Sequence, residues 1–309
     1  MIYDILIVGG GPAGMTAALY GARAGKNVLL IEAQACGGQI LESRKIENYP
    51  ALPDVDGYTF AEGLKGQILS LGVTIENGRV DKIEEQKGAF CAYVGEKGYL
   101  CRSVILATGL RHRRLGVVGE DKLVGRGVSF CATCDGMFFR RREVAVIGGG
   151  NTAVQDALLL SEFCAKVYLI HRRTTLRAER ELAERLKKRE NIEFIGNTVV
   201  TELRGAERLE SLLLQDVSTK NERELVVAGV FEAIGQLPQN GAFASMVALD
   251  NDGYFITDEQ CATTCRGIFA AGDGRQKTIR QLTTAVSDGT IAALSAVTYL
   301  ETLKEESEE

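Results

Sequence analysis

Two cysteines separated by two residues, Cys131 and Cys134, are the side chains in this 309-residue sequence best suited to redox chemistry. Two thiols at this spacing can close a small, reducible disulfide, and their surroundings can stabilise one of them as a thiolate. Asp135 follows directly, and a carboxyl group beside a dithiol can supply or accept the proton that thiol–disulfide exchange requires. The sequence therefore predicts Cys131, Cys134 and Asp135 as catalytic residues.

A zinc site is the alternative interpretation of this cysteine pair, and it requires four nitrogen or sulfur ligands that converge. The other close pair, Cys261 and Cys265, has a wider spacing, and the sequence contains only two histidines. We therefore expect no metal, and we expect the remaining cysteines to be small core or surface residues. Cys36 precedes a pair of glycines, which leaves a secondary redox role open for it.

A glycine-rich turn near the N-terminus lies between elements that could position a nucleotide. Residues 4–8 form an apolar run, residues 15–23 an alanine-rich helical stretch, and residues 27–31 a second run that ends at Glu32. In such a βαβ unit the glycines let backbone N–H groups approach a pyrophosphate at the start of the helix. The predicted contacts in this turn are Gly9, Gly11, Pro12, Ala13 and Gly14.

The same pattern returns later in the chain. Residues 143–147 and 166–170 are apolar runs, and between them lie a glycine turn at 148–153 and a helical stretch at 154–163. A single glycine turn would be weak evidence, but two in the same strand–turn–helix context are specific. The predicted contacts in the second turn are Gly148, Gly150, Asn151 and Thr152.

Shorter repeats support a duplicated domain. Runs at 104–109 and 230–235 close the two halves, and alternating segments at 90–94 and 212–217 precede them as antiparallel inserts. We therefore predict an α/β fold of two Rossmann-like dinucleotide-binding domains with antiparallel β inserts. A last strand near 267–273, a long helix over 281–300 and a solvated or frayed acidic tail follow.

The two turns differ in the residue that ends their second strand. Glu32 can accept hydrogen bonds from ribose hydroxyls and would repel a 2′-phosphate, so the first site is predicted to bind FAD or NAD. The equivalent place after the second turn holds His171, Arg172 and Arg173, with Arg177 close behind. Guanidinium groups bind phosphate bidentately, so the second site is predicted to prefer NADPH. The alternative is a solvated basic strand end or a set of ion-pair partners for nearby glutamates.

Composition excludes several other classes of protein. The formal net charge is −5, whereas a nucleic-acid-binding protein needs a basic face. No stretch reaches the roughly 18 apolar residues of a membrane span. The first apolar run begins at residue 2, which leaves no room for a secretory leader. We therefore expect a cytoplasmic protein.

Taken together, these segments resemble the low-molecular-weight thioredoxin reductases over nearly the whole chain. The cysteine motif with its aspartate is the most specific element, and the order of the motifs is more specific than any one of them. The motifs are the two glycine turns, Gly37-Gly38-Gln39-Ile40, Ile46-Glu47-Asn48-Tyr49-Pro50, Ala107-Thr108-Gly109, Cys131-Ala132-Thr133-Cys134-Asp135-Gly136, His171-Arg172-Arg173 with Arg177-Ala178, Ala270-Ala271-Gly272-Asp273 and Arg280-Gln281.

The resemblance implies a glutathione-reductase-type fold, bound FAD and NADPH, a homodimer, and thioredoxin or a thioredoxin-like protein as the disulfide partner. It implies that Cys134 is nearest the flavin, that Cys131 attacks the partner, and that Asp135 is the acid–base group. Val80 would contact the adenine through its backbone, and Asp273 would hold a ribityl hydroxyl. The FAD contacts implied beyond the first turn and Glu32 are Gly38, Gln39, Asn48, Val80, Thr108, Gly272, Asp273, Arg280 and Gln281.

The resemblance also implies a discontinuous FAD-binding domain, residues 1–113 and 241–309, around an NADPH-binding domain, residues 114–240, that carries the disulfide. Because nicotinamide and disulfide both belong to the second domain, we expect it to rotate so that each reaches the flavin in turn. Ile279 and Gly274 depart from the common pattern of the family, which has tyrosine and valine there, and both could shift the flavin potential.

Several alternatives share parts of this pattern. The flavoprotein of a peroxide-reducing system carries an additional N-terminal redox domain, which a first strand at residue 2 disfavours. A ferredoxin-fed relative would not need the cationic strand end, and a ferredoxin–NADP reductase of this fold typically lacks the cysteine pair. A flavin-binding redox sensor would not require two complete nucleotide sites.

Overall fold

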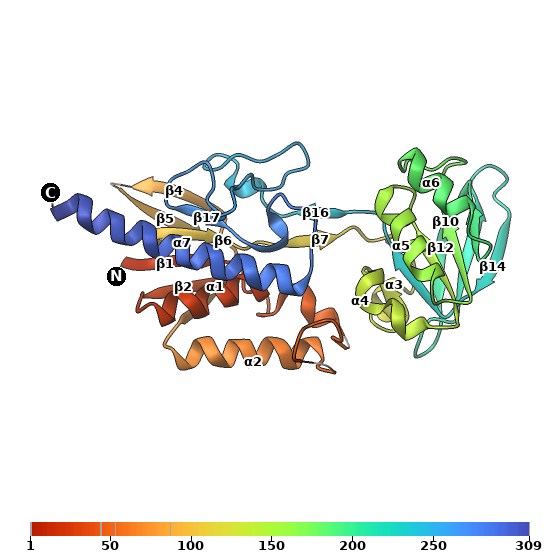
Figure 1. The fold of residues 1–309 in the computed structure, drawn as a ribbon, viewed down its shortest axis with the longest axis horizontal. Coiled ribbons are helices and arrows are strands. Elements are labelled where there is room, and N and C mark those ends of the chain that lie inside the picture. The colour runs from red at the N-terminus through yellow and green to blue at the C-terminus, as the bar shows by residue number, and fades with distance from the viewer. Residues whose placement is uncertain (1, 44, 53, 87, 309) are drawn as a thin grey trace. The chain divides into compact units, whose positions relative to one another are not determined.

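The computed structural model describes residues 2–43, 45–52, 54–86 and 88–308, and the chain divides into two compact units. The first unit consists of Met1–Arg111 and Leu237–Glu309, and the second is His112–Gln236 (Figure 1). The chain crosses between them twice, and the crossing strands β7 (Leu110–His112) and β16 (Gln236–Pro238) pair with each other. Both crossings lie within a few residues of the expected domain boundaries.

The sheet of the first unit has the order β3-β2-β1-β6-β5-β4, and β17 pairs with β6. Strands β1, β2, β3, β6 and β17 pair in parallel, whereas β4 and β5 form an antiparallel insert on β6. The continuous apolar sequence of the inner strands suits burial on both faces. The strands are β1 (Ile2–Val8), β2 (Val28–Glu32), β3 (Thr74–Asn77), β4 (Lys82–Gln86), β5 (Ala89–Val94), β6 (Lys97–Leu106) and β17 (Ile268–Ala270).

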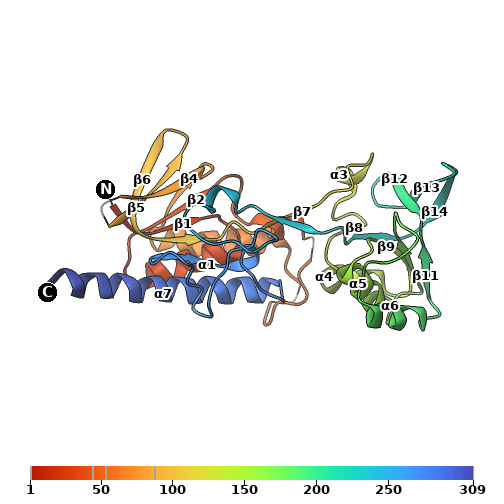
Figure 2. The same cartoon turned by 90° about the horizontal axis from the view of Figure 1, so that it is seen from above.

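Helices α1 (Pro12–Arg23) and α7 (Leu282–Glu308) lie side by side against this sheet, as Figures 1 and 2 show. A Cβ on Gly289 would lie 2.2 Å from the carbonyl oxygen of Ala13, so glycine is required where α7 meets α1. Helix α2 (Gly57–Ser70) packs on α1 and begins at Asp56, whose carboxylate accepts the N–H of Thr59 at 2.8 Å. Short 3₁₀ turns η1 (Gly38–Glu42), η3 (Gly241–Phe243) and η4 (Gly272–Gly274) complete the unit.

The second unit repeats the first in a smaller form. Its parallel sheet has the order β11-β10-β9-β15-β8, and a separate antiparallel sheet, β12-β13-β14, forms the insert. The strands are β8 (Val128–Ser129), β9 (Glu143–Ile147), β10 (Lys166–Ile170), β11 (Ile192–Ile195), β12 (Thr198–Arg204), β13 (Ser211–Asp216), β14 (Glu222–Val226) and β15 (Gly229–Glu232). The helices are α3 (Glu120–Leu123), α4 (Ala132–Asp135), α5 (Asn151–Ser161) and α6 (Arg180–Lys187), with the 3₁₀ turn η2 (Gly136–Phe139).

The predicted fold class is confirmed, but three helix boundaries differ from the expectation. Helices α1 and α5 begin directly after Gly11 and Gly150, three residues before the helical stretches expected from residues 15 and 154, because each of these glycines is already the N-cap residue. The acidic tail is helical and solvated rather than frayed, since α7 continues through Glu308 and residues 304–306 are exposed. Good helix formers fill its last turns, and Arg266 pairs with Glu306 at 2.6 Å.

No helix in the described part of the chain is long and apolar enough to cross a membrane.

Candidate active site

The first glycine turn joins β1 to α1 and is shaped by two close backbone approaches. Gly9 has φ +105°, and a Cβ there would lie 2.3 Å from the carbonyl oxygen of Ala107, just after β6. A Cβ on Gly14 would lie 1.9 Å from the carbonyl oxygen of Gly9, so the helix can start against the turn. Gly11 faces open space, and no side chain of the described residues caps the helix. The first N–H groups of α1 are therefore left for an anion, as a pyrophosphate requires.

The second turn reproduces this geometry between β9 and α5. A Cβ on Gly148 would lie 2.4 Å from the carbonyl oxygen of Ala233, just after β15, and Gly150 again faces open space. Within the described part of the chain, no side chain caps α5. Asn151 instead exchanges two hydrogen bonds of 2.8 Å with Glu179, one to its carboxylate and one from its N–H, which fixes the loop beyond β10. The two glycine turns that repeat in the sequence therefore also have the same local structure.

Glu32 and His171 occupy equivalent places, each against the middle glycine of its turn. The carboxylate of Glu32 accepts the N–H groups of Gly10, at 2.5 Å, and of Gln34, at 2.8 Å. A Cβ on Gly149 would lie 2.3 Å from the imidazole of His171, so that ring rests directly on the turn. His171 is therefore the structural equivalent of Glu32, as the comparison of the two turns in the sequence predicted.

His171 and its three neighbouring arginines do not share one environment. His171 is buried, and its Nε2 has no hydrogen-bond partner among the described residues. The side chains of Arg172, Arg173 and Arg177 are exposed, and none forms an ion pair within the part of the chain that the structure describes. Burial, followed by the charges of Arg177, Arg172 and Arg173, lowers the pKa of His171. Arg172, Arg173 and Arg177 together are called the cationic edge here. They have no anionic partner among the described residues, and a phosphate group would supply one.

The polar residues expected beside the first nucleotide make tertiary contacts in the first unit. Gln39 donates to the carbonyl oxygen of Leu110 at 2.9 Å, and Asn48 donates to the side-chain oxygen of Gln281 at 3.3 Å. Val80 is buried, and the N–H of Gly78 binds the carbonyl oxygen of Glu32 at 2.8 Å, which places the segment before Val80 at the end of β2.

Asn240 fixes the loops around Thr108 and was not found by sequence reasoning. The hydroxyl of Thr108 donates to its side-chain oxygen at 2.6 Å, and its amide donates to the carbonyl oxygens of Gly253, at 2.9 Å, and Gly274, at 2.8 Å. A Cβ on Gly274 would lie only 3.2 Å from the Thr108 hydroxyl. This close contact is a physical reason for glycine at position 274.

Asp273 offers a buried acceptor in the turn after β17. Its Oδ1 has no hydrogen-bond partner among the described residues, although the ammonium group of Lys277 lies 3.8 Å away. Burial raises the pKa of Asp273. Arg280 is held close by, with Nε donating to the carbonyl oxygen of Asp273 at 3.3 Å and its guanidinium 4.3 Å from the ring centre of Tyr254. An unpartnered acceptor at this place fits a hydroxyl of a bound nucleotide.

Asp288 on α7 anchors the same turn and was also missed by sequence reasoning. Its carboxylate, only 10% exposed, binds Arg275 at 2.9 Å and Lys277 at 2.8 Å, and it accepts the N–H of Gly272 at 3.1 Å. The signal in the sequence was a carboxylate inside an otherwise apolar helical stretch. Asp288 therefore ties the C-terminal helix to the turn that carries Asp273.

Cys131 and Cys134 form a disulfide, with their Cα atoms 5.3 Å apart. The N–H of Cys134 lies 3.2 Å from the sulfur of Cys131. The hydroxyl of Ser129 donates to Asp135 Oδ2 at 2.6 Å, and Ser129 Oγ accepts the N–H of Cys131 at 3.1 Å. Burial raises the pKa of Asp135, and the Ser129 hydrogen bond opposes that shift. The structure thus brings the three predicted catalytic residues onto one short segment.

A second buried acid lies at the end of β15, beside the second turn. Glu232 is 4% exposed, and neither of its carboxyl oxygens has a hydrogen-bond partner among the described residues. The neighbouring Glu120 is also buried, and its carboxylate accepts N–H groups from Leu115, at 3.1 Å, and Gly116, at 2.6 Å. Burial, reinforced by Glu120, raises the pKa of Glu232 to about 8. Glu232 therefore holds a proton at neutral pH.

These groups share the carboxyl edge of one parallel sheet. Strands β10, β9, β15 and β8 are neighbours in that order, and they end at His171, the Gly148 turn, Glu232 and Ser129. The chain runs from β9 outward to β10 and returns on the other side at β15, so β9 and β15 flank a switch point, where nucleotides bind in such sheets. The disulfide follows β8 at the same edge.

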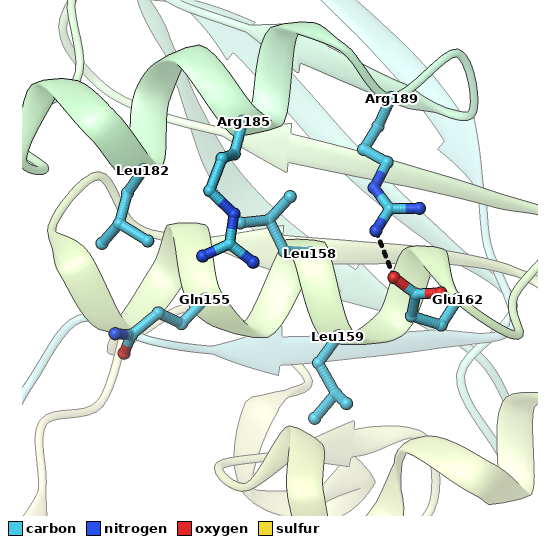
Figure 3. A pocket seen from close by; sticks show the side chains of 7 residues that line it. All are labelled: Gln155, Leu158, Leu159, Glu162, Leu182, Arg185 and Arg189. Atoms are coloured by element: carbon cyan, nitrogen blue, oxygen red, sulfur yellow. Dashed lines mark hydrogen bonds and ion pairs between the residues drawn. The ribbon is translucent and has the colours of Figure 1, made fainter.

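The six other cysteines are free thiols. Burial, followed by the charge of Glu32, raises the pKa of Cys36, which disfavours the thiolate that a redox role would need. A surface hollow of about 280 Å³ between α5 and α6 is lined by Leu158, Leu159, Leu182 and Arg185, and Arg189 pairs with Glu162 at its edge (Figure 3). None of these lining residues belongs to the turn, the cationic edge or the disulfide.

Comparisons with known proteins point to the same chemistry. The family model described as pyridine nucleotide-disulphide oxidoreductase matches residues 3–289. The chain is 45% identical over 304 residues to the thioredoxin reductase of Treponema pallidum (strain Nichols), with 98% of both chains covered. The solved thioredoxin reductase from Streptococcus pyogenes MGAS5005 is 41% identical, with a TM-score of 0.95 and coverage of 97% of this chain and 99% of that one.

The FR conformation of the Lactococcus lactis thioredoxin reductase is 39% identical with the same coverage and a TM-score of 0.67. These matches imply a flavin and a pyridine nucleotide as the bound groups.

Replacing Asp288 by asparagine tests its anchoring role. Because breaking a buried ion pair costs about 3–5 kcal/mol, we expect Asp288→Asn to lower the unfolding free energy of the first unit and to release flavin. The measurements are urea unfolding and the ratio of flavin to protein absorbance after gel filtration. The control is Glu301→Gln on the same helix, whose side chain is 61% exposed and 3.9 Å from Lys26. Equal flavin retention in both variants would contradict the assignment.

Glu232→Gln is expected to change how stability depends on pH. The unfolded chain releases the Glu232 proton above its ordinary pKa, whereas the folded chain keeps it until about pH 8, so the wild type loses stability as the pH rises through that window. The glutamine side chain mimics the neutral acid and removes this loss. Urea midpoints measured from pH 5 to pH 8 should therefore diverge in favour of the variant as the pH rises. The exposed Glu207→Gln in the same unit should run parallel to the wild type, and parallel curves for Glu232→Gln would refute the prediction.

Proposed function

Because the chain belongs to the pyridine nucleotide-disulphide oxidoreductase family, as a thioredoxin reductase, we propose a division of the reaction between its two units. The first unit binds FAD, and the second binds NADPH and carries the Cys131–Cys134 disulfide that reduces thioredoxin or a thioredoxin-like protein. The observation that carries this proposal is that the disulfide follows β8 in the same unit as a complete nucleotide turn.

The residues of the first unit fit FAD. Gly11 leaves open space before the uncapped start of α1, and Glu32 closes the turn with a carboxylate that suits ribose hydroxyls. The unpartnered Oδ1 of Asp273 suits a ribityl hydroxyl. Gln39, Asn48, Thr108, Arg280 and Gln281 would line the same site. The bound cofactors supply the electrons that open the disulfide, by hydride transfer from NADPH to FAD.

The residues of the second unit fit NADPH. The three exposed arginines beside His171 have no ion-pair partners among the described residues, and the buried Nε2 of His171 has no hydrogen-bond partner there. A 2′-phosphate would satisfy both, since guanidinium groups bind phosphate in charge-assisted pairs. Gly148, Gly150, Asn151 and Thr152 would hold the pyrophosphate at the start of α5.

The contacts of the disulfide favour different roles for its two cysteines. The N–H of Cys134 is directed at the sulfur of Cys131, and a donor of this kind stabilises a thiolate. Cys131 is therefore the thiol that attacks the partner disulfide, and Cys134 is the one that receives electrons from the flavin side. Asp135, whose pKa is raised by burial, is the acid–base group of the exchange.

The second unit rotates between two arrangements in this proposal, because the disulfide and the nicotinamide site lie on the same unit and each must reach the flavin. The hinges are the two crossings, near Arg113-Arg114 and on the β16 side of residues 239–241, since Asn240 itself is held by hydrogen bonds within the first unit. Support comes from the solved Lactococcus lactis thioredoxin reductase, which is described as an FR conformation and is 39% identical to this chain. A homodimer and a cytoplasmic location complete the proposal, and the free state of six cysteines is typical of a reducing compartment.

The electron path predicts a separation of two activities. In Cys134→Ser, NADPH should still bleach the flavin under anaerobic conditions, whereas thioredoxin reduction should fall by at least about a hundredfold, because no disulfide can form. The control is Cys265→Ser, which changes a free thiol of the first unit and should keep both activities. Bleaching without thioredoxin reduction in the wild type would mean that another disulfide protein is the partner. No response to NADPH would mean a different electron donor.

The cationic edge predicts the preference between NADPH and NADH. Arg173→Ala removes one charge-assisted contact to the 2′-phosphate, so the KM for NADPH should rise by about tenfold or more while the KM for NADH stays unchanged. Stopped-flow flavin reduction with each nucleotide measures both values. Arg208→Ala, an exposed arginine elsewhere in the same unit, should change neither. Equal losses with both nucleotides would argue that Arg173 supports only the fold.

A further inference from the structure

Ser129 links the redox segment to the sheet of the second unit. It is the last residue of β8, is 5% exposed, and pairs with Phe231 of β15, so its backbone is held by a parallel ladder. Cys131 and Asp135 follow on a short helical turn that has no strand partner of its own. The hydroxyl of Ser129 is therefore a polar group on a fixed strand end that contacts both residues.

The hydroxyl accepts one hydrogen bond and donates another. Its Oγ accepts the N–H of Cys131 at 3.1 Å, and its proton goes to Asp135 Oδ2 at 2.6 Å. The carbonyl oxygen of Cys131, at 3.5 Å, is the competing acceptor for the same proton. The shorter contact to an ionisable carboxyl group is the stronger one, so the proton belongs to Asp135.

We propose that Ser129 is a positioning residue for the exchange reaction. It holds the Asp135 carboxyl group in one orientation beside the disulfide, and it holds Cys131 at a fixed position relative to that carboxyl group. The inference rests on the proposed function and extends it to a residue outside the cysteine motif. One hydrogen bond that the hydroxyl donates and one that it accepts fix the acid–base group and the attacking cysteine relative to the same strand end.

The step that depends on this arrangement is the reduction of the partner disulfide by the two cysteines. The Cys131 thiolate attacks one sulfur of the partner disulfide, forming a mixed disulfide and expelling the other sulfur as a thiolate, which takes the proton of Asp135. The Asp135 carboxylate then takes the proton of the Cys134 thiol. The resulting Cys134 thiolate attacks Cys131 Sγ, which restores the Cys131–Cys134 disulfide and releases the second partner sulfur as a thiolate. Two electrons have then passed to the partner, and Asp135 is left protonated by the proton from Cys134.

The sign of the expected effect follows from the hydrogen bond. A donor to the ionised carboxylate favours that form, so Ser129 holds the pKa of Asp135 below the value that burial alone would give. Ser129→Ala removes the donor, and the pKa of Asp135 should then rise by about half to one unit, as expected for the loss of one hydrogen bond. Ser129→Thr keeps the hydroxyl on a strand residue and should restore the wild-type value.

The first measurement is the titration of Asp135 itself in the oxidised holoenzyme, followed by the ¹³C chemical shift of its carboxyl group and assigned with Asp135→Asn. An upward shift in Ser129→Ala with the wild-type midpoint in Ser129→Thr is the expected result. An unchanged midpoint in Ser129→Ala would overturn the inference. This readout does not require thioredoxin, so it stands even where the proposed function fails.

The second measurement is single-turnover oxidation of the reduced holoenzyme by thioredoxin disulfide between pH 5 and pH 9. Ser129→Ala should slow this step by about tenfold and move the pH limb that Asp135→Asn abolishes, whereas flavin reduction by NADPH should keep its rate. In the Asp135→Asn background, Ser129→Ala should add no more than about twofold. A loss of the same size with and without Asp135 would mean that Ser129 supports only the segment, and would overturn the inference. A wild type that does not react with thioredoxin would count against the proposed function alone.

Discussion

The backbone of each glycine turn passes so close to the end of a neighbouring strand that no side chain fits between them. A Cβ on Gly9 or Gly148 would lie 2.3 or 2.4 Å from a carbonyl oxygen of the next strand connection. This contact fixes where each following helix begins and leaves its first N–H groups uncapped at the carboxyl edge of a parallel sheet. The other groups of the site occupy strand ends on the same two edges. The positions of the glycine turns and of the charged groups beside them are therefore set by where the buried strands end.

Burial at these edges also sets the protonation of the acids. Desolvation raises the pKa of Asp135, Asp273 and Glu232, but each has a different neighbour. Asp135 receives a hydroxyl proton, Asp273 lies near an ammonium group, and Glu232 faces a second carboxylate. One physical effect thus yields an acid that can exchange a proton, an acceptor open to a ligand, and a carboxyl group that stays neutral.

Sequence reasoning located the groups whose signal is local. The glycine turns, the cysteine pair with Asp135, and the residue that ends each second strand could all be found by spacing, because each lies within one βαβ unit or one short motif. It missed Asn240, whose partners Thr108 and Gly274 lie 132 and 34 residues away in the chain, and it missed Asp288 and Glu232, whose burial no local pattern marks. The starts of α1 and α5 were placed too late, because residue composition was used to predict them. The helices begin directly after Gly11 and Gly150, whose backbone conformation makes them N-cap residues. The extent of α7 depended on favourable residues at its end rather than on a stop signal.

The discontinuity of the first unit imposes an order on biosynthesis. Strand β6 needs β17 as its neighbour, and α1 needs α7 against it at Gly289, yet both partners lie in the last stretch of the chain. A ribosome delivers His112–Gln236 complete, with its own sheet and insert, before these partners exist. The second unit can therefore fold during translation. The N-terminal glycine turn is made first, but the helix that follows it gains its contact with α7 only at the end of synthesis.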